Sequence, residues 1–174
     1  MKKYSIEIKW TIVFVLMTLL WMVGEKLTGL HDENIEHHLV YTNFYAIPAI
    51  AVYVLALLDK RKHYFQGTIT YKQGFVTGLV MTAMIAFLSP LTQYITSVVI
   101  TPEYFPNVIA YVVQHGMMSL QEAEAQFNLT NYIFQSVIGA LVMGIVTSLI
   151  VAFFVRKKAV NKGKNDLAFS ESEG

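Results

Sequence analysis

The sequence contains no cysteine, only four prolines and few charged side chains. Without cysteine there can be no disulfide, thiolate nucleophile, cysteine-bound zinc or iron–sulfur cluster. Charged residues make up 14% of the chain and hydrophobic residues 55%, which is too apolar for the surface of a soluble domain of 174 residues. The net charge of +1 provides no bulk attraction to nucleic acid. The solvent of this protein is therefore predicted to be largely lipid.

The short motifs of the common enzyme classes are also missing. The sequence has no G-x-S-x-G elbow, no H-E-x-x-H zinc motif, no phosphate-binding loop and no dinucleotide fingerprint. No charge lies in the middle of an apolar stretch, which argues against an ion-coupled transporter. We therefore expect a protein that is not an enzyme and has no cofactor.

Four apolar stretches are long enough to cross a bilayer, which takes about 20 residues in a helix. They cover residues 6–24, 40–58, 74–100 and 132–155. No stretch alternates between apolar and polar residues with the period of a strand. The sequence predicts an all-α fold: a four-transmembrane-helix bundle in a single domain over residues 1–158, followed by a disordered tail over 159–174.

Two of these stretches contain residues that are unusual in a membrane helix: charged residues at the start of the first and a proline in the third. The first stretch is short, so Lys9 should extend to the interface and Glu7 should lie there as well. In the third stretch, Pro90 cannot donate a hydrogen bond to the carbonyl of Ala86, which predicts a kink.

The basic residues are segregated along the chain. All thirteen except Lys26 lie before the first stretch or at its start, between the second and third, or after the fourth. Lys and Arg near helix ends resist translocation, so both termini and the second loop are predicted to be cytoplasmic. The first and third loops, where acidic residues predominate, are predicted to face outward.

The third loop has the pattern of one or two short amphipathic helices. Its apolar stripe consists of Phe105, Val108, Ile109, Val112 and Val113. Further on, Ser119 and Glu122 have the spacing of a capping box. These helices would lie over the outer mouth of the bundle or in the interface plane, and either membrane-surface packing or docking of a partner would explain the stripe.

Several segments carry a family resemblance: residues 4–30, 31–34 (HDEN), 41–49 (YTNFYAIPA), 71–75 (YKQGF) and 89–93 (SPLTQ). In these the chain resembles the bacterial small membrane proteins grouped as domain of unknown function 4199. The resemblance covers residues 1–158. It implies four membrane helices and a bacterial cytoplasmic (inner) membrane, and it brings no catalytic residues with it.

Small residues recur at every fourth position of two predicted membrane helices. The fourth stretch has Ser136, Ala140, Gly144, Ser148 and Ala152, and the third has Gly74, Gly78, Thr82 and Ala86. Small faces allow helix backbones to approach closely in lipid. The spacing fits packing within one chain and fits a homodimer seam equally well.

Polar side chains fall in the outer half of three predicted helices. They include Asn43, Gln93 and Gln135, close in depth to Pro48, Ser89 and Pro90, with Glu25 just above. Polar groups in hydrocarbon need partners, so these should face inward. They are either plain interhelical hydrogen bonds or the lining of a small outward-facing ligand site.

The first outer loop concentrates metal-capable side chains. A helical loop would place Glu33 beside His37, and His31 could be a third ligand. His115 of the third loop could add another. A solvated acidic loop and a metal or proton-sensing site both fit this composition.

Three hypotheses of function follow. The first is a non-enzymatic membrane protein that acts by helix packing with itself or with a membrane partner. The second is a small permease or ligand-binding protein that uses the outer polar side chains, and the third is a metal or pH sensor. The expected partners are the lipid bilayer and a homodimer or membrane-protein partner, not nucleic acid.

Overall fold

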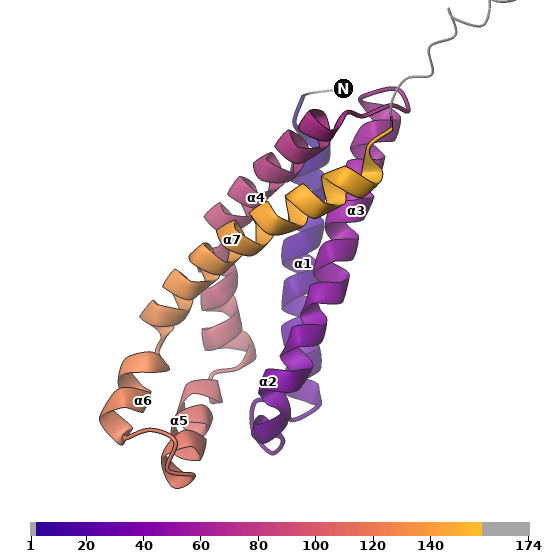
Figure 1. Ribbon diagram of the computed structural model, residues 1–174. Helices are drawn as coiled ribbons and strands as arrows, with labels where there is room; N and C mark the ends of the chain where they lie inside the picture. Colours follow the sequence, from indigo (N-terminus) through magenta and orange to yellow (C-terminus); the bar gives the residue numbers. More distant parts are fainter. Residues whose placement is uncertain (1–2, 158–174) are drawn as a thin grey trace, which may run out of the picture.

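The structure is a computed structural model that describes residues 3–157, so the tail predicted to be disordered lies outside the described residues. Four helical stretches are long and apolar enough to cross a bilayer (Figure 1). They are α1 (Ser5–Leu27), η2 with α3 (Thr42–Tyr45 and Ala46–His63), α4 with η3 (Tyr71–Tyr94 and Ile95–Ile100), and α7 (Leu129–Val155). Residues 3–157 contain no strand, so the predicted all-α fold is confirmed.

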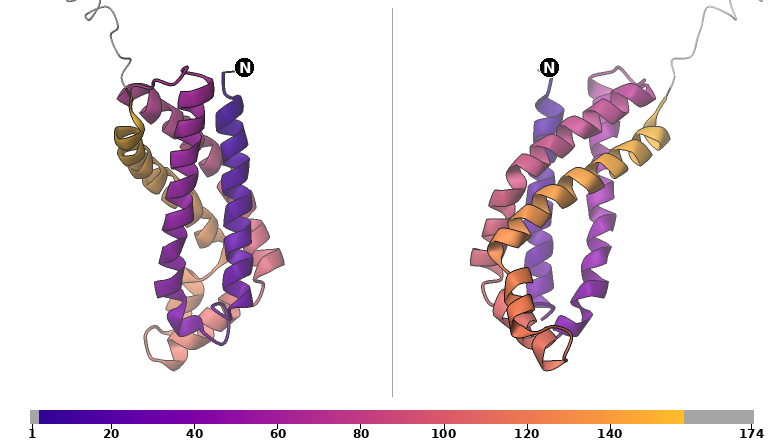
Figure 2. Two further views of the ribbon diagram at one scale, coloured as in Figure 1. Left: turned by 90° about the vertical axis from the view of Figure 1, so that its right-hand side faces the viewer. Right: turned by 60° about the vertical axis from the view of Figure 1, so that its left-hand side comes forward.

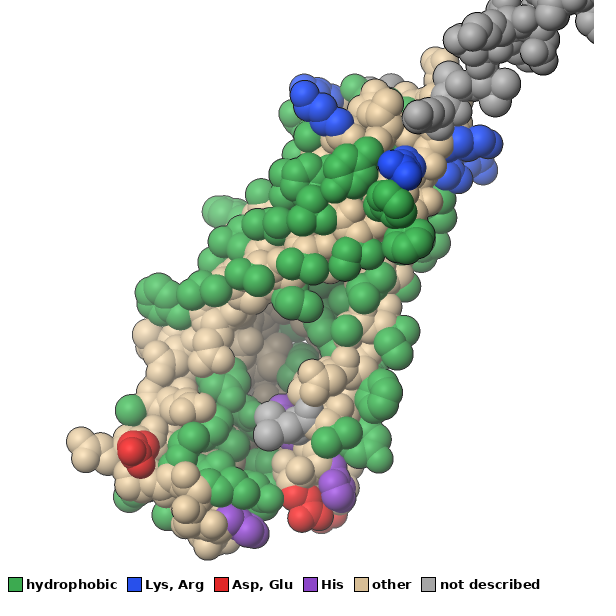
Figure 3. Space-filling model, in the orientation of Figure 1, with side chains coloured by type: hydrophobic (Ala, Val, Ile, Leu, Met, Phe, Trp, Pro, Cys, Tyr) green, Lys and Arg blue, Asp and Glu red, His purple; other side chains and the backbone are tan. Residues whose placement is uncertain are grey.

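The short helices gather at one end of the bundle. They are η1 (Ile35–His37), α2 (His38–Tyr41), α5 (Tyr104–Gln114) and α6 (Leu120–Gln126). We call this the capped end. The opposite end, with the start of α1, the α3–α4 loop and the end of α7, is the basic end (Figures 1 and 2). On the face drawn in Figure 3, Lys and Arg gather at the basic end, and the Asp, Glu and His side chains that are visible lie at the capped end.

Helix α7 packs chiefly along α4, and the two small-residue faces meet (Figure 2). A methyl group on Gly78 would lie 2.4 Å from Ser148 Oγ, and one on Gly74 would lie 3.2 Å from Ala152 Cβ. A methyl group on Gly144 would lie 2.5 Å from both branches of Thr82. The helices approach this closely because neither face carries a large side chain.

Pro90 lies within α4 without ending it. The carbonyl of Ala86, which Pro90 cannot satisfy, accepts a hydrogen bond of 2.9 Å from the hydroxyl of Ser89. Beyond Tyr94 the helix continues as the π-helix η3, and the N–H of Thr101 donates to the carbonyl of Thr96. These backbone groups near the capped end of the helix are therefore satisfied despite two departures from α-helical bonding.

At the basic end, Glu7 of α1 is buried inside the bundle and paired. The carboxylate is 2% exposed and pairs at 2.8 Å with Lys60 Nζ, itself 3% exposed. The same ammonium donates to the carbonyl of Lys3 at 2.6 Å and lies over the ring of Tyr64. Helix α3 can continue past the predicted end of its apolar stretch because this buried charge is fully paired.

Further contacts close the basic end. Asp59 accepts hydrogen bonds from Lys9 and from Trp10 Nε1, the latter at 2.7 Å. Arg61 donates to the carbonyl of Val155 at 2.9 Å, at the end of α7. Ile69 of the α3–α4 loop exchanges backbone hydrogen bonds with Lys157. These contacts fix α1, α3 and α7 to one another at this end.

The two helices predicted in the third loop are present. Val108 and Val112 of α5 are buried against Ala123 of α6, and Ile109 and Val113 are partly buried beside them. Ser119 Oγ accepts from the N–H of Glu122 at 3.3 Å, and the Glu122 carboxylate accepts from the N–H of Ser119 at 2.9 Å. The predicted capping box is therefore confirmed.

Candidate functional site

A cavity of about 370 Å³ lies between α1, α3, α4 and α7, toward the capped end. Figure 3 shows a hollow on this side, between α7 and α3. The apolar lining includes Phe14, Tyr53, Ile85, Ala140 and Met143, and the polar lining includes Thr18, Ser89, Thr92, Gln93, Thr96 and Ser136. Hydroxyls and one amide thus face a largely apolar space inside the bundle.

The three predicted ligand-binding residues are not brought together in this cavity. Gln93 lines it, and its amide donates to Ser97 Oγ at 2.9 Å. Asn43 and Gln135 are exposed and do not contribute to the lining. Each residue of a helix is rotated by about 100° from the one before it, so residues at the same depth can point in different directions. The prediction used depth alone, and these two side chains point away from the bundle interior.

A second depression is a groove of about 1000 Å³ along α1 and α3. Its walls include Leu16 and Leu20, whose side chains are 54% and 71% exposed. Side chains this exposed on a helix that is apolar enough to cross a bilayer are suited to contact with lipid. Of these two depressions in the described residues, the cavity between the four helices is the more enclosed.

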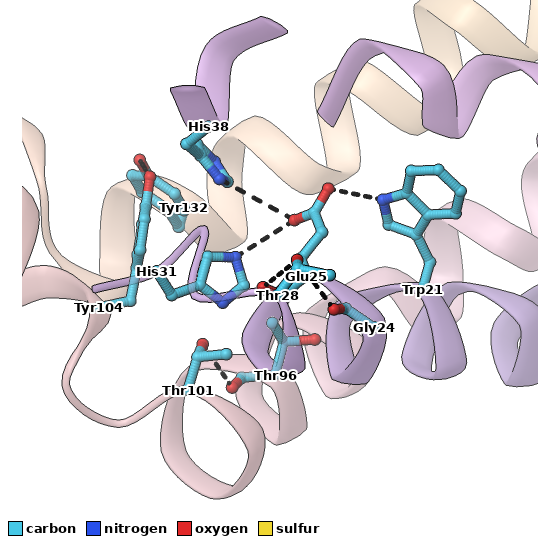
Figure 4. A network of polar contacts seen from close by, with 10 residues as sticks. All are labelled: Trp21, Gly24, Glu25, Thr28, His31, His38, Thr96, Thr101, Tyr104 and Tyr132. Carbon is cyan, nitrogen blue, oxygen red and sulfur yellow. Dashed lines mark hydrogen bonds and ion pairs between the residues drawn. The ribbon is translucent and has the colours of Figure 1, made fainter. Parts of the chain in front are cut away.

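Above the cavity, Glu25, His31 and His38 form a cluster at the capped end (Figure 4). One ligand atom from each lies within 4.8 Å of the other two. Glu25 Oε2 lies 3.2 Å from His31 Nε2 and 3.9 Å from His38 Nδ1. The other carboxylate oxygen accepts a hydrogen bond of 2.6 Å from Trp21 Nε1.

The end of α1 brings His31 back to Glu25. Gly29 has a φ of +74°, its N–H donates to the carbonyl of Lys26, and the N–H of Leu30 donates to that of Glu25. This is a Schellman motif, for which glycine is favoured because a left-handed residue must follow the helix. The chain folds over the helix end, so a histidine six residues after Glu25 reaches its carboxylate.

Aromatic side chains join the cluster to helices α5 and α7 at the capped end. The ring of Tyr104 on α5 lies 5.1 Å from that of His31 and 5.3 Å from that of His38. Its hydroxyl lies 3.2 Å from that of Tyr132 on α7. Asn107 Nδ2 donates to the carbonyl of His31 at 2.9 Å. The cluster therefore contacts α5 directly and reaches α7 through Tyr104.

Burial shifts the pKa of His38 and that of the neighbouring Tyr104, both of which lie outside the membrane spans. It lowers the pKa of His38 below its ordinary value, although the charge of Glu25 acts in the opposite direction. Burial also raises the pKa of Tyr104 far above its usual range. At neutral pH the imidazole of His38 is uncharged and the Tyr104 phenol keeps its proton.

Of the predicted metal residues, the structure places His31 in this cluster and the other two outside it. Glu33 is exposed and lines a shallow surface pocket with His115. His37 is exposed and pairs with Glu36 at 3.4 Å. Residues 35–37 form a 3₁₀ turn, so the α-helical spacing that placed Glu33 beside His37 does not apply.

Sequence reasoning missed Glu25 and His38 as members of one cluster. A usable signal was the carboxylate itself, because an acid at the end of an apolar helix needs a partner when it is buried. His38 adjoins His37 in the sequence, and only its position at the start of α2 turns it inward.

The fold defines a multi-pass membrane protein with four membrane-spanning helices. The chain belongs to the family described as protein of unknown function (DUF4199), whose profile matches residues 9–157, and the predicted family is confirmed. No curated protein and no solved structure matches the chain.

Proposed function

We propose that this chain is a non-enzymatic protein of a bacterial cytoplasmic membrane that binds an amphipathic molecule from the outer half of the bilayer. Both termini would be cytoplasmic, because Lys and Arg gather at the basic end and resist translocation (Figure 3). The capped end would then face outward. The cavity between α1, α3, α4 and α7 would lie in the outer half of the membrane.

The cavity is the observation that carries this proposal. Its volume of about 370 Å³ falls in the range of about 300–1,000 Å³ that is usual for ligand pockets. Phe14, Ile85 and Met143 offer an apolar surface, and Gln93 and Thr96 offer hydrogen-bonding groups. This combination suits a molecule with an apolar body and one polar end.

The asymmetry between the two ends supports the same function. At the basic end, Glu7, Lys60 and Arg61 bind the helices to one another. Toward the capped end, α7 separates from α3, where the space-filling surface is hollowed (Figure 3). A ligand would therefore enter from the outer leaflet through this hollow, and passage to the other side of the membrane is not required.

Action through helix packing with itself or a membrane partner has less support. The small residues Gly144, Ser148 and Ala152 contact α4 of the same chain, so most of this face is not available to a second copy. Most exposed residues of α7, such as Phe154 at 78% exposure, are apolar, as expected of a lipid-facing surface.

Photolabelling can test the ligand proposal. The purified protein would be reconstituted in vesicles that contain a fatty acid with a diazirine in its acyl chain, and labelled residues would be mapped by mass spectrometry. We expect labelling of the cavity-facing residues of α7, which Ala140→Phe should abolish by filling the cavity. The control Val142→Phe lies on the exposed face of the same helix and should leave labelling unchanged.

Gln93→Leu provides a second arm, because it removes the amide and leaves the apolar lining. It should fold normally yet lose the rise in melting temperature that the fatty acid gives the wild type. Equal cavity labelling in the Ala140→Phe and Val142→Phe variants would refute the proposal. Labelling restricted to lipid-facing residues such as Phe87 would refute it as well.

A further inference from the structure

The histidines above the cavity leave buried nitrogen atoms without hydrogen-bond partners. Among the described residues, neither His31 Nδ1 nor His38 Nδ1 has one. The side chain of His31 is 5% exposed, that of Glu25 is 3% exposed and that of His38 is 15% exposed. A buried polar atom without a partner costs about 1–3 kcal/mol, so a native structure that keeps one calls for an explanation.

Hydrogen bonding within the cluster does not supply that explanation. Glu25 Oε2 already pairs with His31 Nε2 at 3.2 Å. His38 Nδ1 is directed at the same oxygen but stands 3.9 Å away, which is too long for a hydrogen bond. Two ligands of one tetrahedral ion at about 2.0–2.2 Å would lie about 3.3–3.6 Å apart, between these two distances.

The geometry points to a zinc site formed by Glu25, His31 and His38, with His31 Nε2 and His38 Nδ1 as the ligand nitrogens. Zinc would give a partner to the buried Nδ1 of His38, and the Nδ1 of His31 would stay on the far side of its ring. Two imidazoles and one carboxylate are a ligand set that zinc uses when one coordination position stays open. All three side chains converge from different elements: the end of α1, the loop after it, and the start of α2 (Figure 4). Zinc binding would draw His38 Nδ1 a few tenths of an ångström closer to Glu25 Oε2, and the three ligand atoms already lie within 4.8 Å of one another.

The surroundings of the cluster fit a metal site. Ligating carboxylates are usually hydrogen-bonded by an outer group, and Trp21 Nε1 donates to the second oxygen of Glu25 at 2.6 Å. The ring of Tyr104 packs against both imidazoles and excludes water from one side. Burial favours the neutral form of His38, the form that binds metal.

A bound zinc ion would connect the first outer loop to the membrane bundle. His31 is also held by Asn107 of α5, and Tyr104 reaches Tyr132 of α7. Metal binding would therefore order the whole capped end above the ligand cavity. None of the three zinc ligands lines the cavity between the helices. Zinc binding can therefore be tested separately from binding of the proposed lipid ligand.

Zinc titration of the purified full-length protein in detergent tests this inference. After removal of metal with a chelator, we expect one zinc ion to bind per chain at micromolar concentration or below. Glu25→Gln and His38→Gln should each weaken binding at least about 100-fold. The matched controls Glu33→Gln and His37→Ala, both in the same loop but outside the cluster, should bind as the wild type does, and so should Gln93→Leu.

X-ray absorption at the zinc edge of the loaded wild type keeps the test decisive even where a variant does not fold. It should show a shell of nitrogen and oxygen with two imidazoles. Absence of binding at about 100 μM zinc would overturn the inference. So would a shell without two imidazoles, or loss of binding in His37→Ala equal to that in His38→Gln.

Discussion

A single methyl group placed between α4 and α7 should be costly, and the structure predicts where. The change is Gly144→Ala. Its Cβ would lie 2.5 Å from both Oγ1 and Cγ2 of Thr82, and 2.9 Å from the hydroxyl of Tyr53. Thr82 is 2% exposed, so it has no space to move into, and the helices must separate or Thr82 must leave its rotamer.

The expected loss combines two contributions. Overpacking by one methyl group in a close-packed interior costs about 1–3 kcal/mol. The displacement also breaks the hydrogen bond of 2.9 Å between Tyr53 and Thr82, and interhelical bonds of this kind are worth about 0.6 kcal/mol on average in a membrane. We therefore expect the free energy of unfolding to fall by about 2–4 kcal/mol.

Gly139→Ala is the matched control on the same helix. A methyl group there would have no atom within 4 Å, so only the better helix propensity of alanine remains, which is worth at most about 1 kcal/mol. The assay is unfolding of the purified protein by SDS in mixed micelles, followed by the fluorescence of Trp10 and Trp21. Values for the two variants within about 0.5 kcal/mol of each other would refute the reasoning.

A companion substitution checks the cause. Thr82→Ala removes the two Thr82 atoms that the new methyl group would meet most closely. The double variant Gly144→Ala/Thr82→Ala should therefore recover at least about 1 kcal/mol relative to the sum of the single changes. The larger pair Gly144→Leu and Met143→Leu should show the same contrast, because Met143 is 59% exposed. Loss of a dimer in the Gly144 variants, without loss of monomer stability, would instead indicate a seam between two copies.

Two further predictions concern the basic end and the orientation. Glu7→Gln leaves the Lys60 ammonium buried without its counter-charge, so the free energy of unfolding should fall by about 3–5 kcal/mol in the same assay. In the control Lys9→Met the lysine is 56% exposed, and the fall should be less than about 1 kcal/mol. Equal losses in the two variants would contradict this account. Because the chain has no cysteine, single substitutions report topology directly: Gln121→Cys should react with a membrane-impermeant thiol reagent in intact cells and Lys62→Cys should not, and the reverse pattern would invert the proposed orientation.

The helices of this fold could be predicted from sequence because each depends on a local pattern. The membrane spans depend on length and hydropathy, and α6 depends on the pairing of Ser119 with Glu122. The carbonyl freed by Pro90 was predictable too, although its partner, Ser89, was not. These features require no knowledge of which helices are neighbours.

The site was harder to predict because its members meet only after the chain has folded. Glu25 and His38 are thirteen positions apart and come together through the turn at Gly29, whose left-handed backbone reverses the chain. The pairing of Glu7 with Lys60 needs α1 and α3 to be side by side. Asn43 and Gln93 are predicted at the same depth in the membrane, but their side chains point in different directions from their helix axes. Hydropathy predicts the depth of a residue and not the direction of its side chain.

The π-helical turn between Ile95 and Ile100 has a consequence for how this chain tolerates changes of length. Bonding from residue i to i+5 accommodates one residue more than an α-helical turn does, and every α-helical residue rotates the chain by about 100°. Removing one residue there would return the turn to α-helical bonding and leave Tyr104 on nearly the same side of the axis. Removing one residue from the α-helical part before Tyr94 would instead swing Tyr104 by about 100° around the axis, away from the imidazoles. The π-helical turn is therefore where this helix can lose a residue with the least change of phase between the membrane helix and the capped end.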